Sequence, residues 1–180
     1  AVVTIGDDAA SEVYVKNKKK ACEYVGMSFL HLDYASCVKE EVVIRKIKQL
    51  NKDKSINGII VQLPIPENFN VSKIINTIDP SKDVDGLTNI QAGKLIQNEK
   101  CLTPCTPKGI MEIFKEYKID LEGKHVVIIG RSNLVGKPLI SLFLNKDATV
   151  TVCHSKTENL KQFTKNADIL VVAIGKKHFI

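Results

Sequence analysis

The stretch KHVVIIGRSNLVGKP, residues 124–138, gives the strongest indication of the fold. Its first part is a short continuous apolar run, which is typical of a strand buried on both faces of a parallel sheet. A glycine-containing turn follows, and we expect a helix from there to about Asn145. This order of strand, glycine turn and helix predicts one unit of a nucleotide-binding sheet.

The same alternation continues to the end of the chain. We expect strands at residues 148–153 and 168–174, with a short helix after Thr157 between them. Together with the strand at 124–129 they form a β-α-β-α-β run. Such a run is half of a doubly wound nucleotide-binding sheet.

Strands and helices also alternate upstream, which indicates an α/β protein with a mainly parallel sheet. Expected strands are residues 2–5, 28–32 and 58–63, and expected helices are residues 11–24, 39–50, 71–78 and 107–117. The prolines of PCTP, residues 104–107, make a rigid break. We therefore expect a first lobe at residues 1–108 and a second at 109–180. The chain begins inside an expected strand without methionine and stops just after another expected strand, so we expect both lobes to be incomplete at their outer ends.

Composition narrows the classes of function. The chain has 180 residues, 44% of them hydrophobic, and a formal charge of +6, which fits binding of nucleic acid, an anionic surface or a polyanionic small molecule. The basic residues are not interleaved with aromatic ones, so we expect no nucleic-acid face, and no segment is apolar enough to cross a membrane. The five cysteines lack zinc-ligand spacing, so we expect reduced thiols and no metal.

The turn after residue 129 is a candidate dinucleotide site, because a helix N-terminus there would present backbone N–H groups to a phosphate. Compared with the usual Gly-x-Gly-x-x-Gly fingerprint, Gly130 is retained, Ser132 replaces the second glycine and Gly136 stands one position late. A plain turn between strand and helix is the alternative. The next expected strand ends before His154 and Ser155 rather than before an acid, and Arg131 favours the extra phosphate of NADP over NAD.

Candidate catalytic residues lie in the first lobe. Tyr14 and Lys18 are four residues apart, so a helix places them on one face, although this face could simply be solvated. A partly desolvated lysine beside other cations can exchange protons near neutral pH. Gln62, near the end of a buried strand, needs partners for its amide, either a ligand or local backbone. Asp83 and Asp85 could hold a cyclic amidine such as a pterin edge, or cap their own turn.

Six motifs occur in a characteristic order. They are GDDAAS (6–11) with Tyr14 and Lys18, VQLP (61–64), KDVDG (82–86), PCTP (104–107), GRS (130–132), and ATVT (148–151) with CHS (153–155). This series resembles the bifunctional methylenetetrahydrofolate dehydrogenase/cyclohydrolase family, although Ala9 stands where the family often has proline. The resemblance implies an N-terminal catalytic lobe and a Rossmann-type NAD(P)-binding lobe with a cleft between them. It also implies NADP-dependent oxidation of 5,10-methylenetetrahydrofolate and hydrolysis of the methenyl product to 10-formyltetrahydrofolate.

The resemblance also implies roles for individual residues. At the folate site, Lys18 would be the acid/base of hydrolysis, Gln62 would form a hydrogen bond with Lys18 and tune it, Tyr14 would stack on the folate, and Asp85 would anchor the pterin ring. At the cofactor site, Arg131 and Ser155 would bind the 2′-phosphate of NADP beside Gly130 and Ser132. Cys105 and Thr106 would lie near the reacting end of the cofactor. The resemblance further implies a homodimer in one-carbon metabolism that serves purine biosynthesis and takes tetrahydrofolate derivatives, including polyglutamylated ones. We expect the protein in the cytoplasm, with a mitochondrion or another organelle as the alternative.

Three alternatives stay open at this point. One is a dehydrogenase of another substrate on a similar scaffold, such as a shikimate-type enzyme, which would leave VQLP and the Asp-Val-Asp turn unexplained. The second is a folate-binding protein without turnover, which would not need Lys18. The third is a nucleic-acid binder, indicated by charge alone.

Overall fold

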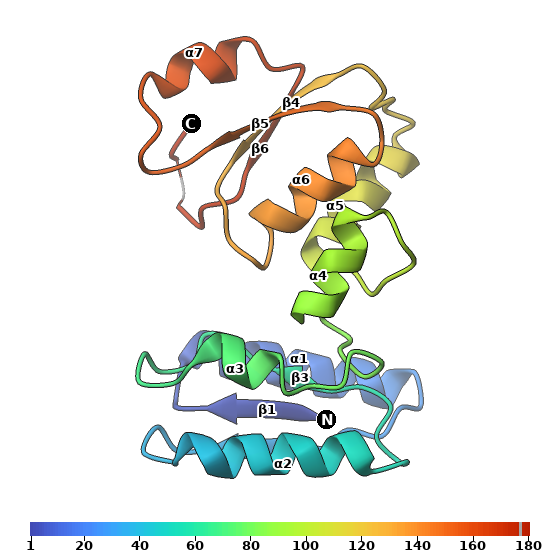
Figure 1. Cartoon of the computed structure of the whole chain (residues 1–180), viewed down its shortest axis with the longest axis vertical. Coiled ribbons are helices and arrows are strands. Elements are labelled where there is room, and N and C mark those ends of the chain that lie inside the picture. Colours follow the sequence, from blue (N-terminus) through green and yellow to red (C-terminus); the bar gives the residue numbers. More distant parts are fainter. Residues whose placement is uncertain (177) are drawn as a thin grey trace. The chain divides into compact units, whose positions relative to one another are not determined.

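The computed structural model describes residues 1–176 and 178–180, and the chain packs as two compact units, Ala1–Val84 and Asp85–Ile180 (Figure 1). Each unit is built from parallel strands with helices on the faces of the sheet. The expected α/β class is therefore confirmed. The division of the lobes after residue 108 remains a proposal.

The first unit is a sheet of order β2-β1-β3 with all pairs parallel. Its elements are β1 (Val2–Ile5), α1 (Ala9–Tyr24), β2 (His31–Tyr34), α2 (Glu40–Lys52), β3 (Ile60–Val61) and α3 (Val71–Ile75). The two crossovers run in opposite directions across the sheet, so right-handed connections put α1 and α2 on opposite faces (Figure 1). All four residues of the central strand β1 are buried.

The second unit has the sheet order β5-β4-β6, again parallel, and confirms the β-α-β-α-β run. Its elements are α4 (Asn89–Ile96), α5 (Cys105–Glu116), β4 (His125–Ile129), α6 (Gly136–Leu144), β5 (Thr149–Cys153), α7 (Leu160–Lys165) and β6 (Ile169–Val172). As in the first unit, its two crossover helices, α6 and α7, lie on opposite faces of the sheet (Figure 1).

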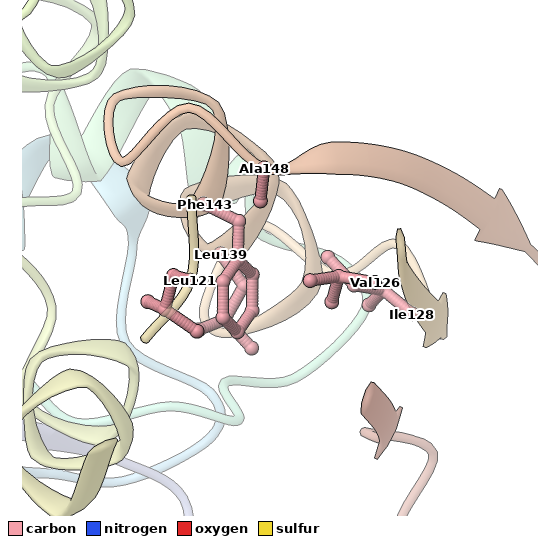
Figure 2. Close-up of a cluster of buried hydrophobic side chains, with 6 residues drawn as sticks. All are labelled: Leu121, Val126, Ile128, Leu139, Phe143 and Ala148. Atoms are coloured by element: carbon pink, nitrogen blue, oxygen red, sulfur yellow. The ribbon is translucent and has the colours of Figure 1, made fainter. Parts of the chain in front are cut away.

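Alternate residues of β4 supply two separate cores. Val127 and Ile129 pack with Cys153 on one face. The other face packs on α6, and its buried cluster, drawn in Figure 2, is Leu121, Val126, Ile128, Leu139, Phe143 and Ala148. Phe143 also meets Phe114 of α5 edge to face, with ring centroids 5.6 Å apart. This double burial explains why the strand is a continuous apolar run.

Four elements differ from expectation, and one of them is α3, which ends at Ile75 rather than at residue 78. The strand expected at residues 28–32 is observed as His31–Tyr34, because the ladder with β1 continues until the N–H of Gly6 donates to the carbonyl of Tyr34. The strand expected at 58–63 is reduced to the two residues of β3. Helix α4 was not expected at all. It begins at Thr88, whose side chain accepts from the N–H of Gln91, and its internal Gly93 weakens the helical signal.

Candidate active site

Helix α1 presents the two residues expected to act in catalysis. Its N-cap is Asp8, whose carboxylate accepts a hydrogen bond from the backbone N–H of Ser11 at 2.7 Å. That bond holds the pKa of Asp8 below its ordinary value, so the cap is charged at neutral pH. One turn separates Tyr14, whose side chain is 61% exposed, from the half-buried Lys18.

The structure brings Lys18 and Gln62 into direct contact. The Nζ of Lys18 donates to the Oε1 of Gln62 at 2.8 Å. The Nε2 of Gln62 donates to the carbonyl of Leu63 at 2.9 Å, which turns the amide oxygen toward the lysine. The backbone N–H of Gln62 donates to the carbonyl of Val3 at 2.9 Å and so ties the residue to the central strand. The amide of Gln62 therefore has two partners, the side chain of Lys18, which the family resemblance implies, and local backbone, which was one of the two alternatives left open by its sequence position.

This geometry suits a proton-transfer group. A lysine ammonium has three donors, and Gln62 occupies one of them. The remaining donors can face a substrate or a water while the amide limits the rotation of the side chain. Tyr14 lies one helical turn away with most of its ring accessible, so it can cover a planar ligand bound beside Lys18.

The two aspartates of the KDVDG turn have different surroundings. Asp83 is 1% exposed, and its backbone pairs with Ile59 in an isolated parallel bridge. Asp85, the first residue of the second unit, is half-buried. Asp83 is therefore part of the first unit's interior, and of the two it is Asp85 that is accessible to a ligand.

A polar network near the start of α1 was not singled out from the sequence. The hydroxyl of Thr4 donates to Asp33 at 2.6 Å and accepts from the Nε2 of His31 at 2.9 Å. These three residues and Ser11 line a cavity of about 630 Å³ that neither Lys18 nor Gln62 borders. The signal for it was the buried polar Thr4 within an apolar strand, which is the same signal that drew attention to Gln62.

The turn after β4 requires both of its glycines. Gly130 has a φ of +122°, and a Cβ there would lie 2.4 Å from the carbonyl oxygen of Ala173. A Cβ at Gly136 would lie 2.3 Å from the carbonyl oxygen of Gly130. Strand and helix therefore approach each other closely at this turn, an approach that the glycines of a dinucleotide fingerprint also permit.

Ser132 stands where the usual fingerprint has its second glycine, and its side chain bonds the start of α6. Its hydroxyl accepts from the N–H of Val135 at 3.2 Å and from the N–H of Gly136 at 3.4 Å. Those two N–H groups at the start of α6 are therefore engaged by Ser132. The exposed side chains of Arg131 and Ser132 remain as donors that the turn can offer to a phosphate.

Neighbouring strands bring Arg131 and Ser155 to one edge of the sheet. Ile129 of β4 pairs with Cys153 of β5, and the ladder ends with the N–H of Gly130 donating to the carbonyl of Cys153 at 2.8 Å. Both side chains are exposed, and no acid occurs in residues 130–138 or 154–157. This donor set fits the phosphates of NADP.

The two remaining candidates for the cofactor site, Cys105 and Thr106, lie on α5 of the second unit. Cys105 and Thr106 form the exposed first turn of α5, and all five cysteines are free. Within residues 1–176 and 178–180, no group of three or more His, Cys, Asp or Glu side chains could hold a metal ion. In the same part of the chain, none of the helices has the length and apolar character that crossing a bilayer requires.

Comparison with known proteins places these features in one family. Residues 1–85 match the tetrahydrofolate dehydrogenase/cyclohydrolase catalytic domain, and residues 104–180 match the NAD(P)-binding domain of the same family. The chain belongs to the tetrahydrofolate dehydrogenase/cyclohydrolase family. A curated member, the bifunctional protein FolD of Clostridium novyi, is 51% identical over 180 residues, which are all of this chain and 65% of the relative. The chain thus spans less than two thirds of that family member.

Solved structures of the family superpose closely on the chain. The bifunctional enzyme FolD of Campylobacter jejuni has a TM-score of 0.94 at 44% identity, with 97% of this chain and 62% of that one covered. The methylenetetrahydrofolate dehydrogenase-cyclohydrolase of Trypanosoma brucei, solved with NADP cofactor and inhibitor, has a TM-score of 0.92 at 31% identity, with 97% and 60% covered. The similarity therefore extends through both units.

Proposed function

We propose that the protein oxidises 5,10-methylenetetrahydrofolate with NADP and then hydrolyses 5,10-methenyltetrahydrofolate to 10-formyltetrahydrofolate. The observation that carries this proposal is the hydrogen bond between Lys18 and Gln62, in a chain that belongs to the dehydrogenase/cyclohydrolase family. A protein that only bound folate would have no use for a lysine held in place in this way. The bifunctional enzyme of Campylobacter jejuni, with 44% identity, supports the same assignment.

Lys18 is the proposed acid/base of the hydrolytic step. A water that attacks the methenyl carbon must lose a proton, and the ring nitrogen that leaves this carbon must gain one. The amine of Lys18 accepts one proton of the attacking water and donates it to the leaving nitrogen, and the second proton of that water is released to solvent when the C–N bond breaks and the formyl C=O forms. Gln62 keeps the lysine in one orientation through both transfers, because its own amide is fixed by the carbonyl of Leu63.

Tyr14 and Asp85 are the proposed folate contacts. The accessible ring of Tyr14 offers a face for stacking on the folate. The carboxylate of Asp85 suits the donor edge of the pterin, which presents two N–H groups side by side. We further propose that the two lobes comprise residues 1–108 and 109–180.

Residues of the second unit are proposed to hold NADP. When bound, NADP accepts the hydride that leaves the methylene carbon. Arg131 and Ser155 take the 2′-phosphate, since both are exposed at the same edge of the sheet. Gly130 and Ser132 shape the turn under the remaining phosphates. Cys105 and Thr106 are proposed to lie near the reacting end of the cofactor.

The physiological setting follows from these activities. We propose a cytoplasmic homodimer that acts in one-carbon metabolism and supplies purine biosynthesis. Polyglutamylated folates are proposed substrates because the chain carries a net charge of +6, part of it in the lysines of residues 16–20.

An absorbance time course on the full-length protein tests the proposal. Methylenetetrahydrofolate is supplied with NADP or with NAD, and reduced cofactor and the methenyl compound are followed together. We expect reduced cofactor to form faster with NADP, with little build-up of the methenyl compound. Persistent methenyl absorbance would remove the hydrolytic half of the proposal. A folded protein that forms no reduced cofactor would be a folate-binding protein instead.

A further inference from the structure

The residues that follow β5 form a turn held by three hydrogen bonds. The backbone N–H of Thr157 donates to the carbonyl of His154 at 2.8 Å. The backbone N–H of His154 donates to the Oγ1 of Thr157, also at 2.8 Å. The N–H of Lys156 donates to the Nδ1 of His154 at 3.2 Å. Two side chains therefore fix the turn from its two ends, and the exposed Ser155 lies between them.

The imidazole of His154 is hydrogen-bonded to the backbone of its own turn. Its Nδ1 accepts the hydrogen bond from the backbone N–H of Lys156, which holds the ring against the turn. The hydroxyl of Thr157 accepts in the same way from the first residue of the turn. Since these contacts are made by the chain itself, the conformation of Ser155 is set before a ligand arrives. Preformed geometry of this kind raises affinity by removing an ordering cost from binding.

The position of the turn indicates which part of a ligand it serves. Cys153 ends β5 opposite Ile129 of β4, and Arg131 follows on the neighbouring strand. Ser155 thus leaves the sheet at the same edge as the guanidinium proposed to take the 2′-phosphate of NADP. A serine hydroxyl makes one short hydrogen bond, so its value depends on how well it is aimed.

We infer that His154 and Thr157 are positioning residues that set the preference for NADP over NAD by holding Ser155 in place. The inference rests on the proposed function, because it assumes that the 2′-phosphate binds at this edge. Neither side chain needs to touch the phosphate for this role. Loosening the turn should weaken NADP, whereas NAD, which lacks the phosphate, should be little affected.

Two matched pairs of variants test the inference on the full-length protein. Thr157→Val keeps the shape of the side chain and removes the acceptor, and Thr157→Ser keeps the acceptor. His154→Leu removes the ring acceptor, and His154→Asn supplies an amide oxygen that accepts from the residue two positions on, as in an Asx-turn. The readout is the Kd for NADP and for NAD, measured by titration calorimetry, with circular dichroism to establish that each variant is folded.

The expected result is that one variant of each pair loses affinity for NADP and keeps its affinity for NAD. Thr157→Val and His154→Leu should weaken NADP about fivefold, the value of one neutral hydrogen bond, with NAD changed by less than about twofold. Thr157→Ser and His154→Asn should keep the wild-type preference for NADP. Equal weakening by His154→Asn and His154→Leu would mean that the imidazole itself binds the phosphate and would overturn the inference.

Two further outcomes would also overturn it. Equal loss of NADP and NAD in Thr157→Val would show that the turn supports the whole nucleotide site rather than the phosphate. An unchanged preference for NADP in Thr157→Val would show that Ser155 does not depend on the turn. Both differ from failure of the proposed function, in which wild-type protein would bind NADP no more tightly than NAD.

Discussion

The ammonium of Lys18 lies 2.8 Å from the Oε1 of Gln62, although 44 positions separate the two residues in the sequence. The pairing depends on the fold of the first unit, because Lys18 is on α1 and Gln62 directly follows β3. Since Gln62 also donates to the carbonyl of Leu63, its oxygen rather than its nitrogen faces the lysine. The amide and the lysine therefore form one hydrogen-bonded pair at the candidate active site.

Replacing Lys18 should separate the two proposed activities. Lys18→Met keeps much of the side-chain volume and removes the proton carrier, so hydrolysis of the methenyl compound should fall by at least about 100-fold. Hydride transfer needs alignment rather than a proton carrier and should be partly retained. The control is Lys20→Met, which changes an exposed lysine of the same helix. Equal loss of both activities in Lys18→Met would mean that Lys18 is mainly structural.

Arg131 should discriminate between the two nicotinamide cofactors. A guanidinium–phosphate contact is charge-assisted, so Arg131→Ala should raise the Kd for NADP about tenfold or more and leave that for NAD within about threefold. Lys146→Ala removes one positive charge just before β5, at the opposite edge of the same sheet, and should change neither value. If Arg131→Ala weakens both cofactors alike, the 2′-phosphate is bound elsewhere.

Asp85 should govern affinity for the folate. Asp85→Asn keeps the shape of the side chain and halves its capacity to accept paired hydrogen bonds, so the KM for methylenetetrahydrofolate should rise by about tenfold. Asp147→Asn is a suitable control, because it removes the same charge at a position with a φ of +59°, which asparagine tolerates. An unchanged KM in Asp85→Asn would exclude Asp85 from the pterin site.

Two glycine variants should have opposite effects on stability. Gly136→Ala places a Cβ 2.3 Å from the carbonyl oxygen of Gly130, and the resulting displacement should cost about 1–3 kcal/mol. Gly93 lies within α4 with nothing inside 4 Å of a built Cβ, so Gly93→Ala should stabilise by about 0.5–1 kcal/mol. Urea unfolding followed by circular dichroism measures both. A Gly136→Ala protein as stable as wild type would disprove the close approach of helix and strand.

The ion pair between Glu40 and Lys73 should make stability depend on pH. Lys73 donates to Glu40 at 2.7 Å, and the N–H of Asn70 donates to the second carboxylate oxygen. These bonds hold the pKa of Glu40 below its ordinary 4.5. The contribution is therefore fully present above that value and is lost as pH falls through the lowered pKa.

The measurement is the Tm of Glu40→Gln against wild type across that range. The variant should have the lower Tm at neutral pH, and the difference should disappear in acid. Glu112→Gln is the control, because its pair with Lys115 is 3.7 Å long and exposed on both sides. A difference in Tm that is the same at neutral and acid pH would rule out this titration.

The sequence predicted elements well where burial is continuous. The apolar run of β4 is buried on both faces, so its pattern indicates the strand and the parallel sheet around it. The strand β2 was misplaced because its alternation of polar and apolar residues covers only four positions, His31–Tyr34, which is too short to fix its limits. Its limits depend on hydrogen bonds with β1, which are long-range. Helix α4 was missed because it has only eight residues and contains Gly93.

In the candidate site too, features that depend on local spacing were predicted, and features that depend on long-range contacts were not predicted from local pattern. Tyr14 and Lys18 share a helix face, which the spacing alone predicts. The contact of Lys18 with Gln62 joins two distant segments, and local pattern carries no signal for it; the family resemblance was needed. The side-chain hydrogen bonds within the turn from His154 to Thr157 were not predicted, because histidine and threonine in a loop are usually solvated, and only the structure shows both side chains bonded to the backbone.

The close approach of Gly136 to the carbonyl of Gly130 has a consequence for redesign of the cofactor loop. The two glycines are six positions apart in this sequence, and the usual fingerprint places its outer glycines one position closer. A graft of a standard loop after Ile129 would remove one residue and shift the start of α6 relative to the strand. The segment from Gly130 to Gly136 should therefore be exchanged as a whole, and an exchange between relatives should keep its length.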